Sequence, residues 1–157
     1  MATMPEDATR VYTSHEKPWL PVPMVPKGEA WIKVIIVDEE RKCVVFKFRF
    51  SPDSELVPHT HECHAVAYTI SGEWEYEGLT LPEGAVAYEP VHSTHTPSSK
   101  PGSELAVVLT SESDRFLINH MPDGTEIEFD LEFFKQMAAI ETAEDLEKLV
   151  EQVQAQS

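Results

Sequence analysis

Histidine is the residue type that stands out in the middle of this chain. Five of the seven histidines fall between residues 58 and 96. His59 and His61 are separated by one residue, so on a β-strand both imidazoles leave the same face and can reach one ion. Imidazole nitrogen is a common ligand of divalent transition metals. The spacing therefore predicts a metal site at this pair.

A third imidazole can reach the pair from a later part of the chain. Gly72 and the run Pro82-Glu83-Gly84 mark turns, and Pro90 leads through a short loop to His95. Turns at these positions can fold a second strand pair back onto the first. We therefore expect His95 to join His59 and His61.

The other histidines have weaker positions. His92 could line the pocket, replace a ligand or be exposed. His64 lies three residues after His61, out of phase with a continuous strand, and could bind the ion only if the loop before it bulges. His15 and His120 have no histidine partner nearby in the sequence, so we expect them to be structural or solvated.

These segments resemble the two motifs of cupins. The first motif corresponds to Pro58-His59-Thr60-His61 with Gly72 at its end, and the second to Pro82-Glu83-Gly84 followed by Pro90 and His95. The resemblance implies a cupin double-stranded β-helix, that is, a jelly-roll barrel. It also implies that His59, His61 and His95 hold a metal.

The chain departs from the cupin pattern at two positions. The opening glycine of the first motif falls at Asp53, which tolerates a left-handed turn. The glutamate of that motif falls at Ala65 or Val66, neither of which can bind a metal. The resemblance therefore implies three neutral histidine ligands and no carboxylate.

The flanking residues narrow the resemblance. The runs 68–76, 87–90 and 94–96 are similar to the small cupin dioxygenases that cleave acetylacetone and 2,4'-dihydroxyacetophenone, and to the cupin domain of ChrR-type anti-sigma factors. The likeness extends from about Trp31 to Phe134. It implies a non-haem Fe(II) enzyme that cleaves a carbon–carbon bond of a β-diketone or hydroxyketone with dioxygen. Zn(II), Ni(II) or Mn(II) could occupy the site in purified protein.

The order of expected elements agrees with an all-β barrel followed by helices. Short β-rich segments alternate with turns, and in the segment 43–50 the residues Val44, Phe46, Phe48 and Phe50 share one face, as core or as a pocket wall. Helical spacing begins only after Asp130. We predict an extended N-terminal arm (1–30), a cupin barrel (31–130) and C-terminal helices (131–157). The proline-rich part of the arm needs a surface to cover, either the barrel or a second subunit.

Several side chains could support the metal. Ligating imidazoles usually donate their other N–H to an acceptor, and Glu89, Glu104 and Glu62 are candidates. Four aromatic residues could line the pocket or the core: Tyr68, Trp74, Tyr76 and Tyr88. We predict Glu89, Tyr68 and Glu104 as catalytic residues, with Tyr68 first among the aromatics because it lies in the Tyr-Thr-Ile-Ser-Gly run that the family shares.

Charge gives a reason for an anionic substrate. Three neutral ligands leave the double charge of a divalent ion uncompensated, which favours an oxygen-donating anion such as an enolate. Two other functions remain open. One is a metal-sensing or ligand-sensing cupin like the anti-sigma domain, and the other is a redox-neutral lyase, isomerase or cyclase in which the metal is only a Lewis acid.

Composition limits the partners. A formal charge of −16 argues against nucleic acid and anionic membranes as partners. No apolar run approaches a membrane span, the N-terminus lacks a secretory core, and Cys43 and Cys63 form no disulfide framework, so we expect a cytoplasmic protein.

No serine-hydrolase, P-loop or dinucleotide motif occurs. Apolar segments at both ends favour a homodimer or homotetramer.

Overall fold

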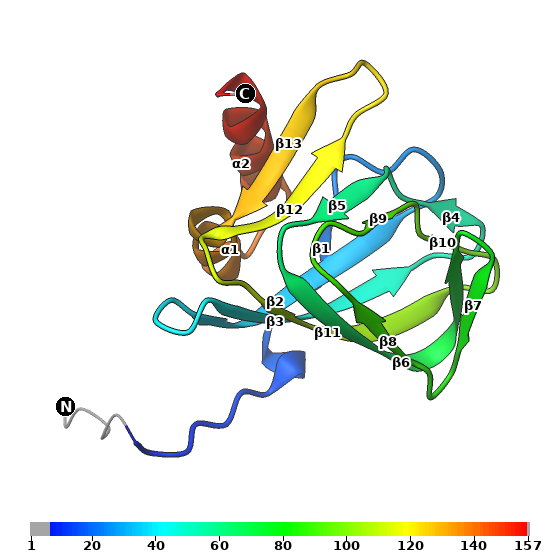
Figure 1. Ribbon diagram of the computed structural model, residues 1–157. Helices are drawn as coiled ribbons and strands as arrows, with labels where there is room; N and C mark the ends of the chain where they lie inside the picture. Colours follow the sequence, from blue (N-terminus) through cyan, green and yellow to red (C-terminus); the bar gives the residue numbers. More distant parts are fainter. Residues whose placement is uncertain (1–6, 157) are drawn as a thin grey trace.

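The computed structural model describes residues 7–156 (Figure 1); the first part of the predicted arm, residues 1–6, and residue 157 lie outside this range. The described chain is mostly β-structure with two helices at its C-terminal end, as predicted. The elements are the 3-10 helix η1 (Ser14–Glu16), β1 (Leu20–Pro21), β2 (Ala30–Asp38), β3 (Cys43–Phe50), β4 (Ser54–Glu55), β5 (His59–His61), β6 (His64–Tyr76), β7 (Leu79–Pro82), β8 (Val86–Glu89), β9 (Thr94–His95), β10 (Ser98–Ser99), β11 (Ser103–Thr110), β12 (Arg115–His120), β13 (Glu126–Asp130), α1 (Leu131–Ala138) and α2 (Ala143–Ala155).

The strands form two curled antiparallel sheets that face each other around one core. The larger sheet has the order β1-β2-β3-β11-β6-β10-β4, with β7 and β8 also paired to β6. The smaller sheet has the order β13-β12-β5-β9. In Figure 1 the two sheets enclose a barrel, and α1 and α2 lie at one end of it.

Strand β3 shows the alternation that the sequence predicted. Val44, Phe46 and Phe50 are buried, Phe48 packs against the same core, and Arg49 between them is exposed. One face of the strand therefore supplies the barrel interior, because successive side chains point to opposite faces. Asp53, in the turn that follows, has φ of +53°, the left-handed conformation expected where the cupin motif has glycine.

Strand β6 changes its inward face partway along its length. Thr69 pairs with Leu105 but Ser71 pairs with Glu104, so β6 carries one extra residue at Ile70. Such a β-bulge moves every later side chain to the opposite face. Ala65, Ala67 and Thr69 are buried before the bulge, and Trp74 and Tyr76 are buried after it.

Both ends of the chain cover the barrel. Strand β1 pairs with β2, and Val22 and Met24 pack against the core. The proline-rich segment therefore covers its own barrel, which is the first of the two surfaces that the sequence analysis named. Asp130 caps α1 by accepting a hydrogen bond from the backbone N–H of Phe133, and Thr142 caps α2 by accepting one from Asp145. The buried faces of both helices close the other end of the core.

Candidate metal centre

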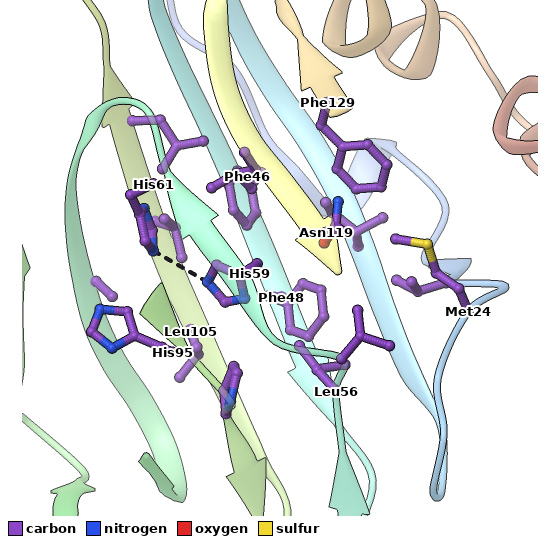
Figure 2. A pocket seen from close by; sticks show the side chains of 18 of the residues that line it. Met24, Phe46, Phe48, Leu56, His59, His61, His95, Leu105, Asn119 and Phe129 are labelled. Carbon is purple, nitrogen blue, oxygen red and sulfur yellow. Dashed lines mark hydrogen bonds between the residues drawn. The ribbon is translucent and has the colours of Figure 1, made fainter. Parts of the chain in front are cut away.

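The H-x-H pair lies on β5, as its spacing predicts. Both imidazoles leave the inner face of the smaller sheet, and the Nε2 atoms of His59 and His61 are 3.2 Å apart. Figure 2 shows the two rings side by side on this strand. Two strand residues with one residue between them therefore aim the same ring nitrogen at one point.

His95 reaches this point from β9. In the pairing of β5 with β9, His95 lies directly opposite His59. The ring centroid of His95 is 5.5 Å from that of His61 and 6.2 Å from that of His59. The three histidines named from the sequence thus lie together, from two segments more than thirty residues apart.

A carboxylate lies among the imidazoles, which corrects the expectation of a site without one. Glu89 Oε2 is 2.6 Å from His61 Nε2 and 3.6 Å from His95 Nε2, and the Glu89 side chain is only 6% exposed. Glu89 stands directly opposite Ala65 in the pairing of β6 with β8. Ala65 is one of the two positions where the cupin motif would place its glutamate. The chain therefore supplies the carboxylate from the neighbouring strand, and the small Ala65 side chain leaves room for it.

These donor atoms fit a divalent transition metal. One ligand atom each from His59, His61 and Glu89 lies within 4.8 Å of the others. Within the described chain, His95 Nε2 is buried and has no hydrogen-bond partner. Buried polar atoms are nearly always paired, and this nitrogen lies 3.6 Å from the Glu89 carboxylate on a ring that neighbours the other two imidazoles, so a cation would satisfy it. Three imidazoles and one carboxylate suit Fe(II), Zn(II), Ni(II) and Mn(II).

His59 is held in the form that binds metal. Burial first, and then the positive charges that His61, His95 and His120 would carry, lower the pKa of His59 from 6.5 to about 3. A neutral imidazole keeps its lone pair, whereas a protonated one cannot bind a cation. His59 is therefore available as a ligand across the neutral pH range.

Glu77 supports His95, and sequence reasoning missed it. Its Oε2 is 3.2 Å from His95 Nδ1, and its Oε1 accepts a hydrogen bond of 3.0 Å from the backbone N–H of Thr96. Glu77 and Gly78 form a two-residue hairpin loop with φ of +44° and +80°. Hairpin loops with two positive φ values usually carry Asn, Asp or Gly, so a glutamate there is unusual. A proton on Nδ1 facing Glu77 leaves His95 Nε2 free to bind a metal.

Tyr76 is the buried phenol of the site. Its ring centroid lies 4.2 Å from that of His95. Burial raises the pKa of Tyr76, and the charges of Glu89 and Glu77 and a hydrogen bond to Glu89 raise it further. The phenol therefore stays protonated and donates to the Glu89 carboxylate.

Two of the three predicted catalytic residues lie elsewhere. Tyr68 precedes the bulge on β6, so it faces outward and is 45% exposed. Glu104 is paired with Lys47 at 3.4 Å and Arg49 at 3.1 Å on the outer face of the larger sheet. Of the three, only Glu89 lines the cavity.

The remaining candidates named from the sequence divide in the same way. Trp74 lines the cavity together with Tyr76, whereas Tyr88 faces outward and its hydroxyl contacts His64 Nδ1. The backbone N–H of His92 donates to the carbonyl of His61, but its side chain is exposed and lies 3.8 Å from Glu62. The Cys63 thiol is buried and donates to the carbonyl of Phe116, and burial raises its pKa to about 12, so it is no thiolate nucleophile.

The cavity beside the histidines is small and apolar. Its volume is about 120 Å³. Figure 2 shows the histidines at one side and apolar side chains around the rest. His59, His61, His95 and Glu89 are the ionisable ligand groups that line it, and the described walls are otherwise mainly aliphatic and aromatic, including Met24, Phe46, Phe48, Leu56 and Leu105. A mainly apolar molecule with one metal-binding end fits this lining.

A family comparison agrees with this architecture. A sequence profile described as the ChrR cupin-like domain matches residues 7–113, which is more than half of the chain. The chain belongs to the ChrR cupin-like domain family. The matched region ends after β11, so it contains β5, β8 and β9, which carry the clustered histidines and Glu89. Among curated proteins, none matches this cupin's sequence.

Solved structures show the same fold at low sequence identity. A putative acetylacetone dioxygenase from Methylibium petroleiphilum gives a TM-score of 0.69 at 19% identity, covering 88% of this chain and 100% of its own. An acetylacetone dioxygenase from Acinetobacter johnsonii gives 0.68 at 13% identity, covering 88% and 94%. The polyketide cyclase RemF from Streptomyces resistomycificus gives 0.59 at 18% identity, covering 88% and 98%. At these identities the likeness establishes the cupin fold, on which dioxygenases and a cyclase both occur.

The described residues hold no helix that is long and apolar enough to span a membrane.

Proposed function

We propose that this cupin is a non-haem Fe(II) dioxygenase that cleaves a carbon–carbon bond in a β-diketone or hydroxyketone. The observation that carries the proposal is the convergence of His59, His61, His95 and Glu89 at one end of an otherwise apolar cavity. The four residues would hold the metal. Bound iron would supply Lewis acidity toward the carbonyl substrate and the electron chemistry that dioxygen needs.

The charge argument for the substrate changes because of Glu89. A divalent ion bound by three neutral imidazoles and one carboxylate keeps one positive charge instead of two. A monoanionic enolate would neutralise that charge. Burying a neutral complex in an apolar cavity costs less desolvation free energy than burying a charged one. The revised charge still favours an enolate, but it argues against a dianionic substrate.

The other residues of the site would act on orientation and water. Glu77 keeps the Nδ1 proton of His95 in place, and Tyr76 donates a hydrogen bond to Glu89. The aromatic wall formed by Phe46 and Phe48 would exclude water from the bound substrate. A cavity of about 120 Å³ suits a small diketone better than a sugar or a polycyclic ring.

The test is oxygen uptake by Fe(II)-reconstituted protein with acetylacetone and with a hydroxyacetophenone. We expect uptake that needs both Fe(II) and the carbonyl compound. His59→Ala removes a ligand and should abolish it, whereas His92→Ala, at an exposed histidine outside the cluster, should not. Metal content of both variants, measured by mass spectrometry, separates loss of iron from loss of turnover.

A sensing function would give a different result. The family profile carries the description of a ChrR cupin-like domain, which keeps a metal-sensing or ligand-sensing function as the second candidate. Stoichiometric zinc in freshly purified protein, together with no oxygen uptake by the Fe(II) form across diketones and hydroxyketones, would refute the dioxygenase proposal and favour sensing.

A further inference from the structure

The outer face of the larger sheet carries an exposed apolar surface. We call it the outer patch and define it by five side chains that are between 37% and 64% exposed. They come from three adjacent strands, β11, β6 and β8. The residues are Val66, Tyr68, Val86, Tyr88 and Val108.

The strand register makes these side chains neighbours. Val66 stands between Val108 of β11 and Tyr88 of β8, and Tyr68 pairs with Val86. Cross-strand partners on one face have Cβ atoms about 5 Å apart, so the five side chains form one continuous surface. A surface of this kind, several hundred Å² in area, commonly marks an interaction site.

The inner face of the same strands is already used. Ala65, Ala67 and Ala87 alternate with the patch residues and are buried in the barrel. An antiparallel sheet with one free face normally has polar residues on that face, whereas strands covered on both faces are apolar on both. Residues 65–68 of β6 and 86–88 of β8 are therefore apolar on both faces, as in strands that are covered on both sides.

The described part of the N-terminal arm covers the other half of this outer face. Lys33 of β2 donates a hydrogen bond of 3.0 Å to the carbonyl of Ser14, and the Trp19 ring lies over Lys33, Lys47 and Arg49. Lys47 pairs with Ala106, and Ala106 pairs with Tyr68, so the covered half adjoins the outer patch. Figure 1 shows residues 7–13 leaving the body beyond η1, where Val11 and Tyr12 are exposed.

We propose that the outer patch is the contact surface for a second copy of this chain. Charge decides between possible occupants. The chain carries −16, so an anionic membrane or nucleic acid would be repelled, and a basic protein would gain more on the acidic parts of the surface. The patch contains no acidic or basic side chain, and the adjacent Glu104 is paired with both Lys47 and Arg49. Two copies can meet here without bringing their carboxylates together.

The geometry fits a two-fold dimer. The same patch on both copies would give an isologous contact of sheet on sheet. The patch alone is smaller than the roughly 800 Å² per partner of a stable interface. Val11 and Tyr12, on an arm that leaves from the same face, would add the missing apolar area by reaching the other copy. This inference concerns the outer face and does not depend on the proposed dioxygenase activity.

The test is the mass of the protein in solution by sedimentation velocity from about 1 to 100 μM, a range that brackets the Kd of ordinary dimers. We expect wild type to show twice the chain mass of 17.7 kDa, or a multiple of that dimer. Val86→Glu should raise the dissociation constant at least 100-fold, because the two-fold axis would bury a pair of like charges. Thermal unfolding of the variant at low concentration checks that it is folded.

Leu79→Glu is the matched control. Leu79 is 59% exposed, close to the 63% of Val86, but it lies on β7, outside the outer patch. Leu79→Glu should leave the mass of the wild type unchanged. The proposal is overturned if wild type sediments as a 17.7 kDa monomer throughout, or if Val86→Glu weakens association no more than Leu79→Glu does.

Discussion

The two ends of the cavity have opposite physical characters. At one end, Phe129 and Phe133 stack with ring centroids 4.0 Å apart, and the Phe134 ring meets both of them edge-on. At the other end, His61 and His95 face Glu89. The rings at the aromatic end pack against one another, whereas the histidine end has buried nitrogens with no hydrogen-bond partner among the described residues. The aromatic end therefore contributes to folding stability, and the histidine end is suited to bind a cation.

This difference has an energetic reason. Apolar side chains gain free energy on burial whatever surrounds them, while buried imidazoles and a carboxylate lose hydration that only a partner restores. A bound metal stabilises the folded state by an amount that grows with its concentration and affinity, and here it would give these buried groups the partner that they lack. The comparison predicts that a change at the aromatic end lowers the free energy of unfolding with little effect on metal affinity. A change at the histidine end should alter metal affinity, or should alter stability in a way that depends on bound metal.

Phe134→Ala should give the largest change in stability. Phe134 is fully buried and its ring contacts Phe46, Phe116 and Phe133, so truncation leaves a cavity. We expect a loss of about 3–5 kcal/mol in the free energy of unfolding. Urea unfolding measures it. Metal affinity per folded molecule should stay within about threefold of wild type; a parallel loss of affinity would break the contrast between the two ends.

Acid should destabilise the metal-free protein through His59. The pKa of His59 is about 3 in the folded state and 6.5 in the unfolded state. Below pH 6.5, His59 therefore binds a proton in the unfolded chain but not in the folded chain. Stability is therefore lost as pH falls from 6.5 toward 3. Between pH 6.5 and 4.5 this amounts to about 2–3 kcal/mol.

Urea unfolding of metal-free protein at several pH values measures this loss. His59→Gln removes the titrating group, so its stability should depend less steeply on pH over the same range. If the stability of His59→Gln depends equally steeply on pH, the acid sensitivity comes from groups other than His59.

Glu77→Gln should lower metal affinity without removing a ligand. The neutral amide is a weaker acceptor for the Nδ1 proton of His95, so the ring is less well oriented and less basic. Changes of this kind cost about 10-fold to 100-fold in affinity. Competition with a chromophoric chelator measures the change. Glu83→Gln removes the same charge in an exposed turn and should leave metal affinity unchanged. Equal losses of affinity in both variants would mean that Glu77 acts only through the net charge of the protein.

The features that the sequence predicts well are those with a local period. The alternation from Val44 to Phe50 gives the inner face of β3, and the spacing of His59 and His61 gives a shared direction, because both depend only on the two-residue repeat of a strand. The start of helical spacing after Asp130 is likewise local, because it follows from the repeat of about 3.6 residues in a helix. His95 could be placed because turns at glycine and proline limit how the chain returns.

The features that it missed depend on contacts between strands. One extra residue at Ile70 turns Tyr68 outward and Tyr76 inward, and no composition signal marks that bulge. Glu89 was named as an acceptor for an imidazole N–H, but its place among the metal-binding atoms depends on its position opposite Ala65, which requires the register of β6 against β8. A motif written along one strand cannot show that its carboxylate comes from the next strand.

Tyr76→Phe should give a smaller effect than the other changes, and it tests the bulge directly. Removing the hydroxyl leaves Glu89 without the donor that Tyr76 provides at the histidine end, at a cost of about 1 kcal/mol in the metal-free protein. Tyr68→Phe removes the same atom from the outer face and should change stability by less than about 0.5 kcal/mol. Metal binding gives Glu89 another partner, so the cost of Tyr76→Phe should shrink when the protein is loaded, while Tyr68→Phe should stay unchanged. If instead Tyr68→Phe lowers the free energy of unfolding more and its effect depends on metal, β6 has no bulge at Ile70. Tyr68 would then be the tyrosine at the histidine end in place of Tyr76.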